Sequence, residues 1–120
     1  MYDHIGLKVK DLDASVRFYS AALEPLGHVP GPGDKTYAGI GPKGAPALWL
    51  YAAGESAGSG THIGFRAPDR LAVERFHKAG LKAGGRDNGA PGLRTDYSPT
   101  YYAAFLIDPD GNNVEAVFLK

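Results

Sequence analysis

Apolar and polar residues alternate along two short stretches of the chain, one near its start and one in its middle. In residues 4–9 the isoleucine, leucine and valine share one face of an extended segment, and the histidine, glycine and lysine share the other. Residues 62–67 repeat this alternation. Each stretch therefore predicts a β-strand with one face buried and the other open.

A helical pattern follows each of these strands. Apolar residues recur at helical spacing from Leu12 to Leu23, and Asp11 or Asp13 offers a side-chain oxygen to cap the helix start. In the second half, Asp69 is the predicted cap, and an apolar stripe continues to a predicted helix end at Gly80. Each predicted strand is thus followed by an amphipathic helix.

Short segments that favour β-structure come after each helix. They are residues 36–40 and 47–52 in the first half, and 101–107 and 113–119 in the second. The last two are joined by Asp-Pro-Asp-Gly at residues 108–111, which is a strong hairpin turn. Each half is therefore predicted to contain a strand, a helix and two or three further strands.

The two halves also match residue by residue. When the chain is shifted by 58 positions, residues 4–18 align with residues 62–76 with seven identities in 15 positions and no gap. The joint at residues 53–60 is rich in alanine, glycine and serine, as flexible linkers are. We expect one domain over residues 1–120, made of a module at 1–56 and a module at 60–120.

Composition narrows the classes of function. Lysine plus arginine and aspartate plus glutamate both number 13, so the net charge of zero argues against nucleic acid or an anionic membrane as a partner. There is no cysteine, which excludes disulfides and thiolate metal sites. We find neither a signal peptide nor the ~20 apolar residues that span a bilayer, and therefore expect a cytoplasmic protein.

Three residues in these patterns suit a metal site: His4, His62 and Glu115. The histidines are equivalent under the repeat, and each has a glycine two positions later that leaves space above the sheet. Glu115 lies among apolar residues of the last strand, where a buried carboxylate is costly unless it is paired or binds a metal. Two imidazoles and a carboxylate suit divalent Fe, Mn, Ni, Co or Zn and leave positions open for substrate.

Each of these residues also has a simpler explanation. A single histidine on a strand face is more often structural than a metal ligand. Glu115 could face solvent on an edge strand, or pair with Lys8 or Arg66. The residues alone leave both explanations open, and the equivalence of the two histidines is what favours a metal.

Residues 86–102 read as an irregular segment that is too long for a simple connection. Such segments often carry functional loops. Its residues that could recognise an anionic or aromatic ligand are Arg94, Tyr97, Ser98, Tyr101 and Tyr102. The alternative is an ordered surface loop whose tyrosines pack at its base.

Three motifs occur in order along the chain: His-Ile-Gly at residues 4–6, Asp-Leu-Asp-Ala-Ser-Val-Arg-Phe-Tyr at 11–19, and Asp-Pro-Asp-Gly-Asn-Asn-Val-Glu-Ala at 108–116. Together they resemble the glyoxalase, bleomycin-resistance and extradiol-dioxygenase superfamily, also called vicinal oxygen chelate proteins. The resemblance implies an α+β fold in which two tandem βαβββ modules form a curved, partly open mixed barrel. It also implies one divalent metal in the cleft, held by His4, His62 and Glu115.

One departure from the family pattern concerns Trp49. Glyoxalase I members supply a fourth ligand, usually glutamate, from the last strand of the first module, where this chain has Trp49 roughly opposite Glu115. Glyoxalase I activity is therefore not expected. The set of two histidines and one glutamate better matches what the resemblance implies for fosfomycin-type transferases and dioxygenases. Trp49 either lines the pocket or is a partly buried core aromatic.

These observations predict a metal-dependent enzyme that acts on a small oxygen-rich substrate able to chelate the metal through two adjacent oxygens. The expected reaction class is a lyase, a transferase or a dioxygenase. The alternative is a metal-free binding protein of the bleomycin-resistance type, which sequesters a small molecule. Exposed sheet edges and the family resemblance favour a homodimer. Whether His4 and Glu115 meet within one chain or across the dimer stays open.

Overall fold

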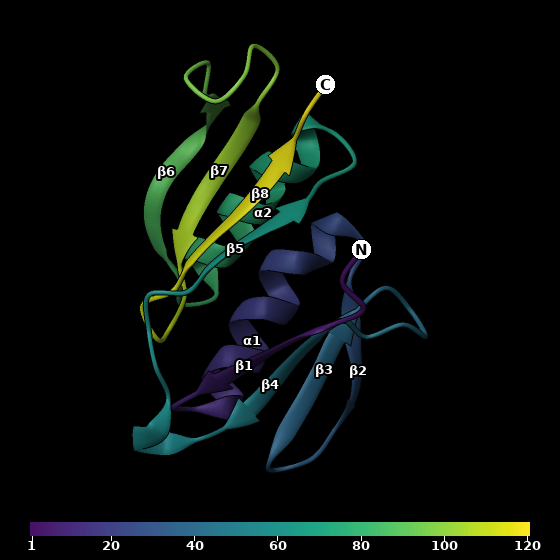
Figure 1. The fold of residues 1–120 in the computed structure, drawn as a ribbon, viewed down its shortest axis with the longest axis vertical. Helices are drawn as coiled ribbons and strands as arrows, with labels where there is room; N and C mark the ends of the chain where they lie inside the picture. Colours follow the sequence, from purple (N-terminus) through teal and green to yellow (C-terminus); the bar gives the residue numbers. More distant parts are fainter.

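The computed structural model describes residues 1–120, which fold into two modules of the same build (Figure 1). The first contains β1 (Ile5–Val9), α1 (Leu12–Leu23), η1 (Glu24–Leu26), β2 (Val29–Gly33), β3 (Tyr37–Gly41), β4 (Leu48–Ala52) and η2 (Gly54–Ser56). The second contains β5 (His62–Arg66), α2 (Arg70–Lys82), β6 (Arg86–Leu93), β7 (Tyr102–Ile107) and β8 (Asn113–Phe118). Neither α-helix has the length and apolar character needed to span a bilayer.

The two sheets have the same topology. Sheet A has the strand order β1-β4-β3-β2 and sheet B the order β5-β8-β7-β6. In each sheet the first and last strands of the module are parallel, and the other pairs are antiparallel. Both sheets stay open, so the predicted α+β fold of two βαβββ modules is confirmed.

Two strands differ from the sequence-based expectation. β2 lies on Val-Pro-Gly-Pro-Gly, and β6 covers the first half of the segment for which the sequence predicts irregular structure. Both are edge strands, where glycine and proline are tolerated because one side of the strand has no partner. β6 also shifts register against β7 around Gly89, as a bulged strand does.

The helices join the modules. α1 packs on sheet A, α2 packs on sheet B, and the two helices contact each other (Figure 1). Their contact depends on Gly80, because a Cβ atom there would lie 2.3 Å from Leu106 Cδ1 and 3.3 Å from Ala22 Cβ. The predicted helix end at Gly80 is wrong. α2 continues to Lys82, and Gly84 follows with a φ of 103°.

Buried apolar side chains of both modules form one continuous cluster around the helices. Leu7 and Val9 of β1 enter it from sheet A, and Val114 and Ala116 of β8 enter it from sheet B. Because side chains alternate along a strand, the other face of each sheet points away from the helices. We call these the outer faces of sheets A and B.

A buried hydrogen bond connects the first helix to the last hairpin. The Tyr19 hydroxyl donates to Asp108 Oδ2 at 2.5 Å, and Asn112 Nδ2 donates to the same oxygen at 2.9 Å. Tyr19 is fully buried, and Asp108 is 2% exposed. Burial, reinforced by the Asp108 charge, raises the pKa of Tyr19, so its hydroxyl remains a donor. This bond joins α1 to the turn between β7 and β8.

Replacing Tyr19 by phenylalanine is expected to lower the free energy of unfolding by about 2 kcal/mol, because Asp108 loses a buried donor. Since folding raises the pKa of Tyr19, this stabilisation is complete below about pH 10 and is lost as the pH rises further. Urea titrations of both proteins at pH 8 and pH 10.5 measure the effect. Tyr97→Phe is the control, since Tyr97 is 64% exposed. Equal losses in the two variants would contradict a special role for Tyr19.

Candidate metal and ligand site

Glu115 lies in the middle of β8 on the outer face of sheet B and is 4% exposed. Its Oε1 lies 2.9 Å from His62 Nε2, and its Oε2 accepts a hydrogen bond from the Tyr101 hydroxyl at 2.8 Å. A buried carboxylate needs such partners to offset its lost hydration. The partners are His62 and Tyr101, and not the Lys8 or Arg66 that the sequence offered as alternatives.

His62 is held so that one ring nitrogen faces Glu115. Its Nδ1 lies 3.1 Å from the backbone oxygen of Asn113, which can only accept a hydrogen bond. Nδ1 is therefore the nitrogen placed to donate to this oxygen, and Nε2 is the nitrogen that faces Glu115 and can give its lone pair to a cation. Metal-binding histidines are oriented in this way, by a carbonyl on the nitrogen that does not bind the ion.

The spacing of the two donor atoms also suits a metal. With metal–ligand bonds of about 2.1 Å, two ligands at a right angle lie roughly 3 Å apart. His62 Nε2 and Glu115 Oε1 are 2.9 Å apart. The His62–Glu115 pair thus has the donor types, the orientation and the separation that a divalent ion requires of two of its ligands.

Tyr101 fixes the carboxylate from its other side. Burial and the hydrogen bond to Glu115 raise the pKa of Tyr101 to about 12, so the hydroxyl stays protonated and donates. The Tyr97 ring packs edge-on against the Tyr101 ring, with centroids 5.0 Å apart. Glu115 Oε1 is therefore left as the oxygen that faces His62.

An aromatic ring and a guanidinium extend this face. Phe105 lies opposite Glu115 in the register of β7 and β8 and stacks on His62, with centroids 6.5 Å apart and ring planes inclined by 17°. The Arg94 guanidinium also lies over the Phe105 ring, 5.3 Å from its centroid. The outer face of sheet B thus presents the donor pair, an apolar ring and a cation.

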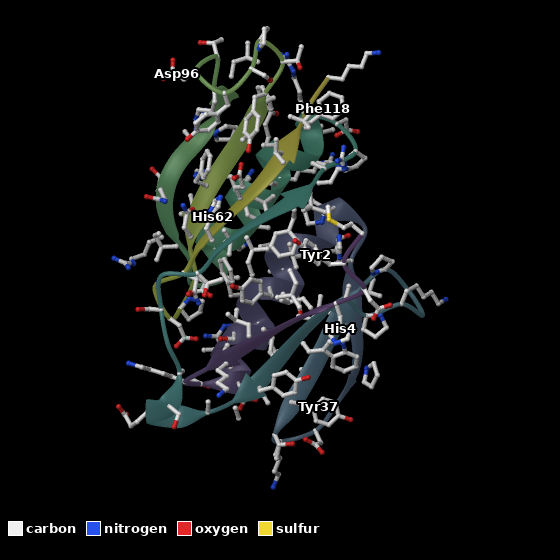
Figure 2. All side chains as sticks on the ribbon, viewed as in Figure 1. Tyr2, His4, Tyr37, His62, Asp96 and Phe118 are labelled. Atoms are coloured by element: carbon white, nitrogen blue, oxygen red, sulfur yellow. The ribbon has the colours of Figure 1, made fainter.

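His4, the third predicted ligand, lies on the other sheet. Figure 2 shows His4 and Tyr37 on sheet A and His62 on sheet B. The His4 side chain is 56% exposed, and its Nδ1 contacts Asp3 Oδ1 at 2.7 Å. Within the chain, no group of three or more histidine, aspartate or glutamate residues is arranged to hold a metal. One chain therefore brings together His62 and Glu115 and leaves His4 apart.

The cavity between the two sheet edges does not connect these residues. It has a volume of about 160 Å³ and is lined mainly by apolar side chains, with His4 on one side and Ile63, Gly64 and Phe65 on the other. Neither His62 nor Glu115 lines it.

Trp49 occupies in sheet A the place that Glu115 occupies in sheet B. It pairs with Gly6 as Glu115 pairs with Gly64. The indole lies over Gly39, where a Cβ atom would approach it to 2.7 Å, and it shares an open hollow with His4, Tyr37 and Tyr51. Trp49 is therefore on the outer face of sheet A and not in the core. At the equivalent position, sheet A carries an aromatic ring and sheet B carries a carboxylate.

The other predicted pocket residues divide between two sides of sheet B. Arg94, Tyr97 and Tyr101 accompany Glu115, as described above. Tyr102 lies on the helix side, where its hydroxyl donates to Glu74 at 2.7 Å and its ring contacts Arg70. Ser98 takes part in the turn after β6 through its backbone, which donates to the Arg94 carbonyl.

Phe105, Tyr37, Tyr51 and the Asn113 carbonyl were not anticipated from the sequence. In the observed register of β7 and β8 the loop has five residues, 108–112, and Phe105 pairs with Glu115. Counting outward from Asp-Pro-Asp-Gly as a four-residue turn would pair residue 105 with residue 114, so the sequence motif does not place Phe105 beside Glu115.

The model of the Glyoxalase/Bleomycin resistance protein/Dioxygenase superfamily matches residues 2–116. The chain belongs to this superfamily. The resemblance inferred from the three motifs is thus confirmed, and the duplicated topology is that of this superfamily. No curated protein sequence matches the chain.

Solved structures of the superfamily share this fold. A glyoxalase/bleomycin resistance protein from Albidiferax ferrireducens T118 is 33% identical, with a TM-score of 0.84 over 98% of this chain and 97% of that one. A glyoxalase/bleomycin resistance protein/dioxygenase family enzyme from Burkholderia phytofirmans PsJN is 19% identical, with a TM-score of 0.75 over 98% of each chain. A glyoxalase-related enzyme from Fulvimarina pelagi is also 19% identical, with a TM-score of 0.74 over 98% of this chain and 87% of that one.

Proposed function

We propose that this member of the glyoxalase superfamily is a metal-dependent enzyme acting on a small oxygen-rich substrate, with a site shared between two chains of a homodimer. The observation that carries the proposal is the His62–Glu115 pair. It is nearly closed to solvent at the carboxylate, tied to the backbone through His62 Nδ1, and spaced as two metal ligands are.

The third ligand would be His4 of the partner subunit. His4 and His62 are equivalent under the internal repeat, and both lie on outer faces that point away from the helices. The outer face of sheet A also exposes part of Tyr37, Trp49 and Tyr51, an apolar surface that a second copy would cover. Placing sheet A of one chain over sheet B of another brings the two halves of the site face to face in a symmetric dimer.

Each residue of the proposed site would have a separate role. His62, Glu115 and the partner's His4 would hold a divalent ion such as Fe, Mn, Ni, Co or Zn and leave coordination positions open. When bound, the ion supplies Lewis-acid stabilisation of charge that develops on substrate oxygens. Tyr101 and the Asn113 carbonyl orient the two ligands, while Phe105 and the partner's Trp49 would exclude water from around the substrate. A lyase, a transferase and a dioxygenase all use such a centre.

Metal content tests the proposal directly. The wild-type protein, incubated separately with Mn, Fe, Ni and Zn and then desalted, is expected to retain about one ion per chain of at least one metal. His4→Ala, His62→Ala and Glu115→Ala are each expected to weaken binding by at least about 100-fold, since even residues that only orient ligands contribute 10–100-fold. His77→Ala is the control, because His77 pairs with Asp87 away from the site.

The rival function is metal-free sequestration of a small molecule, and Trp49 is the observation that favours it. An indole in the place of a carboxylate, next to Tyr37 and Tyr51, makes sheet A suited to an aromatic or apolar ligand. Equally low metal in the wild type and all four variants would favour this binder over the enzyme.

A further inference from the structure

The Arg94 guanidinium is fixed on the outer face of sheet B without an acidic partner. Its Nη1 donates to the Gly92 carbonyl at 2.9 Å and its Nη2 to the Ala90 carbonyl at 2.6 Å. No ion pair in the chain includes Arg94, since every one of them involves a histidine. The two carbonyls use only part of the guanidinium's donors and none of its charge. Arg94 therefore keeps a positive charge and free N–H groups in a fixed position.

The β6 strand next to Arg94 leaves room for the guanidinium in this position. A Cβ atom at Gly89 would lie 3.1 Å from Arg94 Nη2, and one at Gly92 would lie 3.2 Å from Nη1. Both glycines flank the register shifts of β6, and Gly89 has a φ of 154°, which larger residues rarely adopt. The two glycines thus leave the space into which the guanidinium folds back along its own strand.

A role in holding the following turn does not account for the side chain. That turn is closed by backbone hydrogen bonds, from Tyr97 and Ser98 to the Arg94 carbonyl and from Arg94 to the Tyr101 carbonyl. Any residue at position 94 would make these bonds. The guanidinium itself is held by the Gly92 and Ala90 carbonyls and by the Phe105 ring, independently of the turn.

The Phe105 ring contacts both Arg94 and His62. The guanidinium carbon is 5.3 Å from the Phe105 centroid, and that centroid is 6.5 Å from the centre of the His62 ring, so the cation lies within about 12 Å of the His62 ring. A molecule whose oxygens bind at His62 and Glu115 can rest on the apolar Phe105 ring and reach Arg94 with its far end. A guanidinium binds planar oxyanions through two parallel hydrogen bonds.

We propose that Arg94 is the anchor for an oxyanion on the ligand, so that the substrate carries a carboxylate or phosphate group at the end opposite its metal-binding oxygens. The inference that the other end of the substrate binds at His62 and Glu115 rests on the proposed function. The anion site itself does not, because it is formed by Arg94, Phe105 and the β6 glycines of one chain.

Benzoate and benzyl alcohol are a matched pair of probes, since they share a ring for Phe105 and differ in the carboxylate. They are titrated into the metal-free protein and into the Zn-loaded protein, with the Arg94 Nε–H resonance followed by ¹⁵N NMR. Benzoate is expected to bind at least about ten-fold more tightly than benzyl alcohol and to shift that resonance saturably, with or without metal. A parallel titration with inorganic phosphate separates a general oxyanion site from one selective for carboxylates, and binding of either anion supports the proposal.

Three variants give the controls. Arg94→Gln is expected to abolish the preference for benzoate, and Arg94→Lys to keep only part of it because an ammonium lacks the planar fork. Arg75→Gln removes the same charge from an exposed position on α2 and is expected to leave the preference unchanged.

Two results would overturn the proposal: neither a preference for benzoate nor saturable phosphate binding in the wild type, or undiminished anion binding in an Arg94→Gln protein of wild-type thermal stability. Metal binding without an anion preference refutes this proposal and leaves the proposed function standing. An Arg94-dependent preference in a protein that retains no metal refutes the proposed function and supports the oxyanion site.

Discussion

A purified heterodimer of one His4→Ala chain and one Glu115→Ala chain is expected to bind about half the metal of the wild-type dimer, although each homodimeric variant binds almost none. The reason is the division of the ligands between the two outer faces. His4 of the Glu115→Ala chain would meet intact His62 and Glu115 of the other chain, which restores one complete site. The second site of this heterodimer contains both substitutions and therefore lacks both His4 and Glu115. Differently tagged chains, mixed after unfolding and isolated by both tags, allow the metal per dimer to be measured by mass spectrometry.

A heterodimer of His62→Ala and Glu115→Ala chains is the matched control. These two residues lie on the same outer face and 2.9 Å apart, so every site of this heterodimer lacks one ligand and no recovery is expected. If the first heterodimer also fails to recover metal while the wild type binds it, the ligands do not divide between chains in the way proposed.

The second large effect concerns stability and arises at Gly80. Replacing Gly80 by leucine is expected to cost at least about 3 kcal/mol, because even a Cβ atom would overlap Leu106 and approach Ala22 and Phe18. The helices would have to separate, and the continuous core that joins the modules would open. Urea denaturation followed by circular dichroism measures the change.

Gly58→Leu provides the comparison for Gly80. No atom lies within 4 Å of the position that its Cβ would take, so a change within about 0.5 kcal/mol is expected. Wild-type stability in Gly80→Leu would show that α1 and α2 do not need their close contact.

Gly80 also illustrates a limit of sequence reasoning. A glycine near the end of an amphipathic pattern is typical of a helix terminus, and the sequence has no sign of a helix crossing there. The glycine is instead required by α1 and β7, which are distant in sequence. The internal repeat, by contrast, predicted both modules, because it aligns strand with strand and helix with helix without any tertiary information.

The alternation of side chains between the two faces of a strand decided which site residues could be predicted from the sequence. His62 and Glu115 stood out as polar residues on strands of clear alternation, and they lie together. Tyr101 and Tyr102 were both assigned to a pocket because their segment read as irregular, yet neighbouring strand residues point to opposite sides. Alternation along a strand would have separated them, and the observed register of β7 and β8 places Tyr101 on the side of Glu115.

The relation between His4 and Glu115 depends on a different kind of information. The repeat makes their outer faces equivalent, but it does not say whether those faces converge within a chain. That depends on how the modules pack, and here they pack helix against helix. Phe18 and Ala22 of α1 lie beside Gly80 of α2 at this contact, and nothing in the strands themselves indicates it.

The indole at position 49 bears on the charge of the proposed metal centre. Two imidazoles and one carboxylate would leave a divalent ion with one net positive charge, whereas a second carboxylate in the place of the partner's Trp49 would neutralise it. The indole would contribute no charge and would displace water that screens the ion. Such a centre would favour a ligand that carries one negative charge on its chelating oxygens, and it would attract that ligand more strongly as charge builds there.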